Sequence, residues 1–299
     1  MPAASQQAFS MAQVSRAIKT TILRACPRSL RDALLRKYPN LRKAAPPGQS
    51  FVFSEYHSGI KVNVDTRFKV ERIMWSGIYE RPLMRYLDTL DMRGWTCMDI
   101  GANVGAVALV LARKVGAAGR VFAFEPGGPN LQRLRNNFGL NPGLASVTEI
   151  VPSGVGSSCT ELWWSEEEGN PGNASLGVSG SHSVPVTTVD DFVRERSIAR
   201  VDFMKVDVDG MELEVFQGAR ESLMRVRPVL YYETLSRYSD AQGGGNFNKL
   251  DSFLSGECGY TLQRLNGDGR LQPARRSGES DYTVAFHVSE THPSSKRAS

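Results

Sequence analysis

Apolar and polar residues follow a pattern that switches repeatedly between strand and helix periodicity. From Trp95 onward, short apolar runs alternate with segments whose apolar residues recur three and four positions apart. Such runs are typical of buried strands, and the wider spacing is typical of amphipathic helices. The predicted elements are strand 96–99, helix 104–115, strand 121–125, helix 129–138, strand 147–151, helix 190–196, strand 203–208, helix 211–223 and strand 229–232. This alternation predicts an α/β, doubly wound, Rossmann-like fold with a mostly parallel sheet.

Shorter elements and loops flank this pattern. We expect a hairpin from 51–53 and 60–64, a helix over 78–90 that starts near Pro82, and an antiparallel pair from 260–265 and 282–288. Gly- and Ser-rich composition predicts a loop with a hairpin over 152–183 and a mobile loop over 240–248. The expected organisation is a basic helical arm (1–45), a lead-in hairpin and helix (46–94), the main domain (95–288) and a disordered tail (289–299).

The positive charge of the chain is concentrated at one end. The sequence has 36 basic and 31 acidic residues, a net charge of +5. Residues 1–50 hold nine basic residues and one acid, while the rest holds 27 basic and 30 acidic residues. The main domain is therefore slightly acidic, which argues against a nucleic-acid partner. The arm could pack on the domain or on a second copy, contact an anionic membrane peripherally, or act as a mitochondrial transit peptide.

The length of the apolar runs and the spacing of the cysteines indicate the cellular compartment in which the protein is expected. The longest strongly apolar uncharged run, 104–112, is much shorter than the roughly 20 residues that a bilayer span needs. The four cysteines are far apart, which fits a reducing compartment better than a disulfide scaffold. We expect a cytoplasmic protein, with membrane-peripheral and mitochondrial locations as the alternatives.

A glycine-rich turn follows the first strand of the regular pattern. Residues 99–105 read Asp-Ile-Gly-Ala-Asn-Val-Gly, so Gly101 and Gly105 form a G-x-x-x-G spacing in place of the G-x-G-x-x-G of a pyrophosphate cradle. Asp99 at the strand end is unfavourable beside a pyrophosphate but suits a ligand ammonium group. S-adenosylmethionine (SAM) carries an ammonium, a sulfonium and no phosphate, so the turn favours SAM.

The second strand ends in an acid. Glu125-Pro126 lies where a carboxylate can accept hydrogen bonds from a ribose diol. NAD enzymes use the same interaction, so Glu125 alone does not choose between the cofactors. Together with Asp99 and the G-x-x-x-G turn it favours SAM over NAD.

Charged residues interrupt two later strands. Lys205, Asp207 and Asp209 recur at period two, which predicts that all three point to one face. Charges on a central strand are costly unless they pair or face a wet cleft. A structural ion pair between Lys205 and Asp207 is one interpretation and a site at the carboxyl edge of the sheet is the other. Glu233 ends the next strand and would reach the same edge.

These segments together resemble the FkbM family of SAM-dependent methyltransferases. The resemblance rests on Asp99–Gly105, Glu125-Pro126, Lys205–Gly210 with Glu212, Gly218-Ala219, Pro228 to Glu233, an upstream Gly77-Ile78-Tyr79-Glu80, and Asn130, Asn137 and Asn141. It implies a seven-stranded class I methyltransferase fold, SAM as cofactor, and O-methylation of a hydroxyl on a sugar, glycan or secondary metabolite. Asp209 departs from the pattern, because the family usually has Glu there.

The candidate site residues follow from the residue patterns and from the resemblance to the FkbM family. Cofactor binding is expected from Glu80, Asp99, Gly101, Asn103, Gly105, Glu125 and Pro126. The candidate catalytic residues are Asp207, Asp209 and Glu233, acting as a base on the acceptor hydroxyl. A second hypothesis has Asp207 and Asp209 hold Mg²⁺, although we assign no resident metal. The alternative function is a SAM-fold binding or scaffold protein without turnover.

Overall fold

The computed structural model divides the chain into two compact units. The residues that it describes are 48–166, 174–177, 179–234, 246–273 and 281–288. The first unit ends at Tyr79 and the second begins at Glu80. Helix α4 (Arg81–Asp88) therefore belongs to the unit that holds the sheet, whereas the sequence placed it in a lead-in segment. The expected arm over 1–45 and tail over 289–299 lie outside the described residues.

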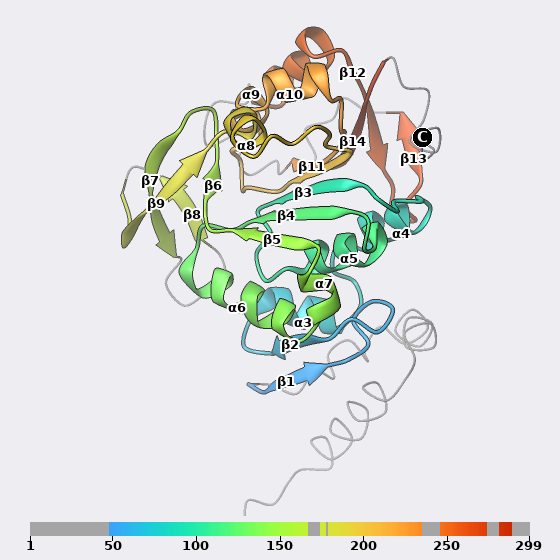
Figure 1. Ribbon diagram of the computed structural model, residues 1–299, viewed down its shortest axis with the longest axis vertical. Coiled ribbons are helices and arrows are strands. Elements are labelled where there is room, and N and C mark those ends of the chain that lie inside the picture. The colour runs from blue at the N-terminus through green and yellow to red at the C-terminus, as the bar shows by residue number, and fades with distance from the viewer. Residues whose placement is uncertain (1–47, 167–173, 178, 235–245, 274–280, 289–299) are drawn as a thin grey trace, which may run out of the picture. The chain divides into compact units, whose positions relative to one another are not determined.

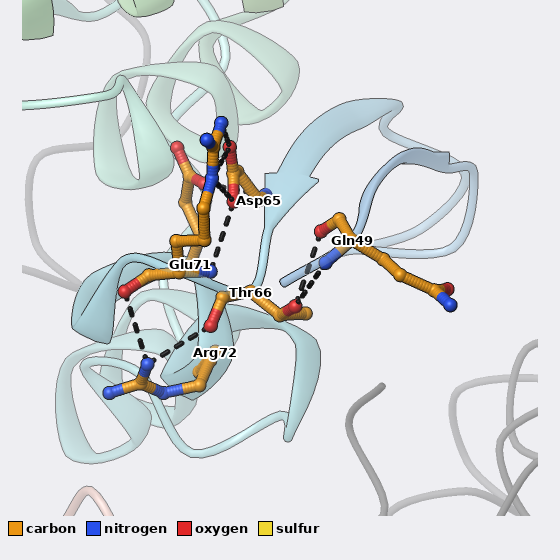
Figure 2. Close-up of polar contacts among 6 residues, drawn as sticks. Gln49, Asp65, Thr66, Glu71 and Arg72 are labelled. Carbon is orange, nitrogen blue, oxygen red and sulfur yellow. Dashed lines mark hydrogen bonds and ion pairs between the residues drawn. The ribbon is translucent and has the colours of Figure 1, made fainter. Parts of the chain in front are cut away.

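The first unit contains the expected hairpin and one unexpected helix. Strands β1 (Ser50–Phe53) and β2 (Val62–Asp65) pair antiparallel, and α3 (Lys69–Trp75) follows. The backbone N–H of Gln49 donates to Oγ1 of Thr66 at 2.9 Å, and that of Asp65 donates to Glu71 at 2.6 Å (Figure 2). Arg72 donates to the carbonyl oxygen of Thr66 at 3.0 Å. These bonds connect the hairpin to the first turns of α3.

The second unit is built on an eight-stranded sheet with the strand order β13-β12-β14-β11-β10-β3-β4-β5 (Figure 1). Strands β11, β10, β3, β4 and β5 are parallel, and β14 runs antiparallel between β11 and β12. The sheet strands are β3 (Thr96–Ile100), β4 (Arg120–Phe124), β5 (Thr148–Val151), β10 (Phe203–Val206), β11 (Val229–Thr234), β12 (Tyr260–Leu265), β13 (Leu271–Pro273) and β14 (Asp281–His287). The doubly wound, mostly parallel fold with a closing antiparallel pair is confirmed. The expected seven strands are present, and the short edge strand β13 is an eighth.

Successive side chains of each strand point to opposite faces of the sheet, and helices pack on both faces. Met98, Phe122 and Met204 face a core that includes Phe192 and Leu223 from the helices on that side. The intervening positions point to the opposite face. Figure 1 shows α8, α9 and α10 on one side of the sheet and α5 and α7 on the other. The helices of this unit, besides α4, are α5 (Ala106–Val115), α6 (Gly128–Gly139), α7 (Pro142–Ala145), α8 (Val189–Glu195), α9 (Glu212–Gln217), α10 (Arg220–Arg225), α12 (Asn246–Asp251) and η2 (Ser252–Glu257).

The segment expected to be a loop with a hairpin forms a second sheet. Its order is β6-β9-β7-β8, from β6 (Gly154–Val155), β7 (Thr160–Glu166), β8 (Ala174–Gly177) and β9 (His182–Thr187). The predicted hairpin is present, because β7 and β8 pair antiparallel, but the predicted loop is wrong, because β9 pairs with β7 and with β6 and extends the hairpin into a sheet. Trp164 on β7 is 5% exposed and Trp163 is 43% exposed, so the two rings point to opposite faces of the strand.

Two other expectations need correction. The helix expected over 211–223 is divided into α9 and α10 at Gly218, where an added Cβ would lie 2.0 Å from the carbonyl oxygen of Gly156. The loop expected over 240–248 is described only from Asn246, where α12 begins. Among the described helices, none combines the length and apolar character that crossing a bilayer requires.

Candidate cofactor and acceptor site

The turn after β3 brings the backbone close to two neighbouring strands. Gly101, Asn103 and Gly105 all have positive φ, at +76°, +52° and +86°. The backbone N–H groups of Gly101 and Ala102 both donate to the carbonyl oxygen of Phe124, at 3.1 and 2.8 Å. A Cβ on Gly101 would lie 2.0 Å from the backbone oxygen of Asp207. Only glycine fits at this position, because the turn combines a left-handed backbone with close packing.

We expect Gly101→Ala to lower the free energy of unfolding by about 3 kcal/mol, from left-handed strain plus the clash with Asp207. Gly94→Ala is the matched control, because Gly94 has φ +75° and nothing within 4 Å of its added Cβ. The control should lose only about 1 kcal/mol, from backbone strain alone. Urea denaturation of both variants measures the difference. If both variants lost the same unfolding free energy, the turn would have to relax away from Asp207 in Gly101→Ala.

Glu125 connects the turn to the start of α6. It follows β4, is buried, and accepts hydrogen bonds from the backbone N–H groups of Asn103 at 2.8 Å and Gly127 at 3.0 Å. Burial raises the pKa of Glu125 to about 7, although the two backbone donors act in the opposite direction. The carboxylate is held at a fixed position at the carboxyl edge of the sheet, where ligands bind in open α/β folds.

A row of polar side chains crosses three strands on one face of the sheet. Lys205 on β10 is the register partner of Asp99 on β3 and of Tyr231 on β11. The ammonium of Lys205 lies 3.2 Å from Asp99 and 3.3 Å from Asp207, and it donates to the carbonyl oxygen of Gly101 at 3.2 Å. Burial favours the neutral amine, but the carboxylates of Asp99, Asp207 and Glu80 hold the pKa of Lys205 above its ordinary value. The ion pair considered from the sequence is therefore present, and Asp207 also lines a pocket, so the two interpretations are compatible.

Three carboxylates meet at the end of this row. Oxygen atoms of Glu80, Asp207 and Glu233 lie within 4.8 Å of one another. Glu80 has φ +45° immediately before α4, and its carboxylate accepts a hydrogen bond from the hydroxyl of Tyr231 at 2.6 Å. Burial and then the charge of Asp207 raise the pKa of Glu80 to about 7, and the same two causes raise the pKa of Glu233 to about 7. We call Glu80, Asp207 and Glu233 the acid trio. Its oxygen atoms could accept a proton or bind a hard cation.

The predicted alternation of charges does not continue to Asp209. Strand β10 ends at Val206, and Asp209 has φ +52° in the following turn, so its side chain does not share the face of Lys205. Asp209 is not part of the acid trio, and the set of Asp207 with Asp209 considered for Mg²⁺ is replaced by the trio. Glu212 accepts from the N–H groups of Val208 and Gly210 at 3.3 Å and fixes this turn.

A pocket lies at the carboxyl ends of β10, β3 and β4. It contains about 750 Å³ of space, part of it open to solvent. The lining residues are Ile100, Gly101, Asn103, Phe124, Glu125, Pro126, Asn130, Ser153, Gly154, Val155, Trp164, Asp207, Val208, Asp209 and Met211.

The predicted cofactor residues fall into two groups. Gly101, Asn103, Glu125 and Pro126 line the pocket, together with the predicted catalytic residues Asp207 and Asp209. Asp99, Gly105 and Glu80 do not line it. Asp99 is 0% exposed and pairs with Lys205, while an added Cβ on Gly105 would lie 2.5 Å from Leu134 of α6. Glu80 and Glu233 belong to the acid trio.

Sequence reasoning missed Tyr231 and the pocket wall formed by Ser153, Gly154 and Val155. Tyr231 stood inside an apolar run, where its hydroxyl gave no separate signal. The wall belongs to the junction between the two sheets, which was expected to be a loop. A polar-apolar alternation over 182–187 was the one signal that could have revealed the second sheet.

The fold and site define a class of protein: a doubly wound α/β domain with a small-molecule pocket built from a glycine turn and strand-end acids. A family model described as the methyltransferase FkbM domain matches residues 99–262, more than half of the chain. The chain belongs to this family.

Two curated relatives match part of the chain. The hexuronic acid methyltransferase AglP of Haloferax volcanii is 30% identical over 138 residues, covering 44% of this chain and 53% of that protein. The methyltransferase sdnD of Sordaria araneosa is 29% identical over 157 residues, covering 42% and 60%. The chain thus spans between half and two thirds of the length of these relatives.

A crystal structure of an FkbM methyltransferase from Methylobacillus flagellatus has a TM-score of 0.41 at 17% identity, covering 73% of this chain and 54% of that one. A likeness at this level carries no argument about activity. The functional argument therefore rests on the family and on the site geometry.

Proposed function

We propose that this protein is a SAM-dependent methyltransferase that methylates a hydroxyl group of a sugar or of a secondary metabolite. The proposal rests on the observation that the pocket and the acid trio share a residue at one edge of the sheet. A pocket with the glycine turn and Glu125 continues to Asp207, which belongs to the acid trio. Family membership supports methyl transfer, and the names of the two curated relatives support a sugar or metabolite acceptor.

The residues of the pocket fit SAM. Gly101 and Asn103 leave backbone exposed to the pocket, and the Glu125 carboxylate can accept hydrogen bonds from the two ribose hydroxyls. The pocket also holds a buried amide oxygen, on Asn130, that has no partner among the described residues. Bound SAM supplies an electrophilic methyl group on its sulfonium. The chain aligns the acceptor with that methyl and excludes water, which are major contributions to such a transfer.

The acid trio supplies the base in this proposal. An alcohol is a weak nucleophile, so removal of its proton during the transfer assists the reaction. Glu233 and Glu80 have pKa values raised to about 7, so near neutral pH each carboxylate can accept a proton. Asp207 lies in both the trio and the pocket, which supports a base that acts beside the cofactor.

Calorimetric titration with SAM, S-adenosylhomocysteine and NADH tests the proposal. We expect binding of the first two ligands and none of NADH. Glu125→Ala should weaken that binding by about 10- to 100-fold, because charged hydrogen bonds to the ribose are lost. Glu195→Ala, at an exposed residue of α8, is the control and should bind as the wild type does. A protein that binds neither nucleoside, or that prefers NADH, would refute the proposal.

A further inference from the structure

Asn130 has a buried polar atom that no described part of the chain satisfies. It is the third residue of α6, is 4% exposed, and lines the pocket. Its Oδ1 has no hydrogen-bond partner among the described residues. A buried carbonyl oxygen without a partner is destabilising, so a bound group that donates a hydrogen bond to it would remove that cost.

Two polar neighbours in the pocket are already engaged. The hydroxyl of Ser153 lies 2.8 Å from the carbonyl oxygen of Gly154 and 3.0 Å from that of Pro185, and it can donate to one of them. Both oxygen atoms of Glu125 accept backbone hydrogen bonds. The side chain of Asn130 is therefore the better candidate for a new, specific hydrogen bond at this end of the pocket.

The order of the strands shows at which end of the pocket Asn130 lies. Along the sheet edge the order is β11, β10, β3, β4, β5, so Glu233 and Asp207 lie at one end and Ser153, which follows β5, lies at the other. Asn130 follows β4 and Glu125. A nucleoside whose ribose contacts Glu125 and whose reactive end lies toward Asp207 places its base toward β5.

The walls at that end suit an aromatic base. Trp164, Val155 and Phe124 line the pocket there. Trp164 packs against Gly127 so closely that a Cβ on Gly127 would lie 2.0 Å from its ring. These apolar and aromatic side chains offer stacking surface, and the carboxamide of Asn130 in the same pocket lining offers a donor and an acceptor.

We propose that Asn130 reads the adenine edge of the cofactor, with its amide oxygen accepting a hydrogen bond from the 6-amino group. A carboxamide pairs well with adenine, because adenine presents an amino donor beside a ring-nitrogen acceptor. Asn130 is thus a specificity-determining residue that selects adenine over a base with a 6-oxo group. This inference rests on the proposed function, since it assumes that the pocket binds SAM.

The test compares two ligands that differ along that edge of the base: deamination replaces the 6-amino donor with a 6-oxo acceptor and adds a proton to the neighbouring ring nitrogen. S-adenosylhomocysteine and its deaminated analogue S-inosylhomocysteine are titrated into the full chain by calorimetry. We expect the wild type to prefer the adenosyl ligand by about 10- to 100-fold, because a 6-oxo group cannot donate to Oδ1. In Asn130→Ala this preference should fall to within about threefold, whereas Asn130→Asp, which keeps an acceptor, should retain it.

Two controls keep the test specific. Glu125→Ala should weaken both ligands equally and leave their ratio unchanged. Asn136→Ala replaces an exposed asparagine of the same helix, which accepts from Gln132 at 3.0 Å, and should change neither affinity. A wild type that binds both ligands equally, or an Asn130→Ala variant that keeps the full preference, would overturn the inference and leave the proposed function standing. Failure of the wild type to bind either ligand would instead refute the proposed function.

Discussion

Replacing Lys205 with methionine is expected to lower the free energy of unfolding at pH 8 by about 4 kcal/mol, the largest stability effect that we predict from the structure. Lys205 is 1% exposed and Asp99 is 0% exposed, and their charged groups are 3.2 Å apart. Methionine fills much of the same volume but leaves Asp99 buried without a cation. The cost comes from that uncompensated charge and from the weaker restraint on Asp207.

The loss should depend on pH in a definite direction. Burial raises the pKa of Asp99 even with Lys205 present, and removal of the ammonium raises it further. A carboxyl group whose pKa is higher in the folded than in the unfolded state stabilises the fold below its unfolded pKa, and that contribution is lost as pH rises. The Lys205→Met variant should therefore be closest to wild type near pH 5 and most destabilised near pH 8.

Urea denaturation at pH 5 and pH 8 measures this difference. The double variant Lys205→Met/Asp99→Asn removes both buried charges and should recover most of the lost stability at pH 8. Lys249→Met, at an exposed lysine of α12, is the matched control and should change stability by less than about 0.5 kcal/mol. A loss that is the same at both pH values, or that the double variant does not recover, would show that Lys205 acts through packing and not through its charge.

The part of the site that the sequence could predict lies within single strands and the turns that follow them. Asp99, Gly101 and Glu125 were recognisable because a charge or glycine at the end of an apolar run marks the carboxyl edge of a parallel sheet. The pairing of Lys205 with Asp207 followed from period two. The same period failed at Asp209, because the backbone turns at that residue, with φ +52°, whereas Asp207 is the first residue after the strand and still lies beside Lys205.

The other part depends on contacts between distant segments, which a periodic pattern cannot encode. Glu80 precedes α4, yet it accepts a hydrogen bond from Tyr231, which lies 151 residues later in the sequence. Trp164 reaches the pocket from the second sheet, whose Gly- and Ser-rich composition predicted a loop with a hairpin. The unpartnered oxygen of Asn130 appears only when its neighbours are in place, since helix periodicity says nothing about hydrogen bonds that are missing.

The largest effect on activity is expected at Glu233. It follows four residues of β11 that pair with β10 and is partly buried. Its carboxylate accepts no hydrogen bond from the described residues, whereas that of Glu80 accepts one from Tyr231. Glu233 is therefore the member of the acid trio best able to accept the acceptor proton. We expect Glu233→Gln to lower kcat by about 10²- to 10⁴-fold, the usual contribution of a general base.

The pH profile of the wild type should carry the signature of this base. Burial and Asp207 raise the pKa values of Glu233 and Glu80 to about 7, and the trio titrates as a coupled group. A base acts only when deprotonated, so kcat/KM should rise with pH up to about 7 and be constant above it. In Glu233→Gln this rise should flatten, because the proton acceptor is gone.

Transfer of radiolabelled methyl from SAM to a hydroxyl acceptor, measured from pH 5 to pH 9, provides both readouts. Binding of S-adenosylhomocysteine by Glu233→Gln should stay within about threefold of wild type, since the lost interaction acts in the transfer step. Glu257→Gln, at an exposed acid that pairs with Arg220, is the control and should keep the wild-type profile. Activity that EDTA abolishes and Mg²⁺ restores would assign the trio to a cation, whereas activity that survives EDTA while Glu233→Gln abolishes it would assign Glu233 as the base.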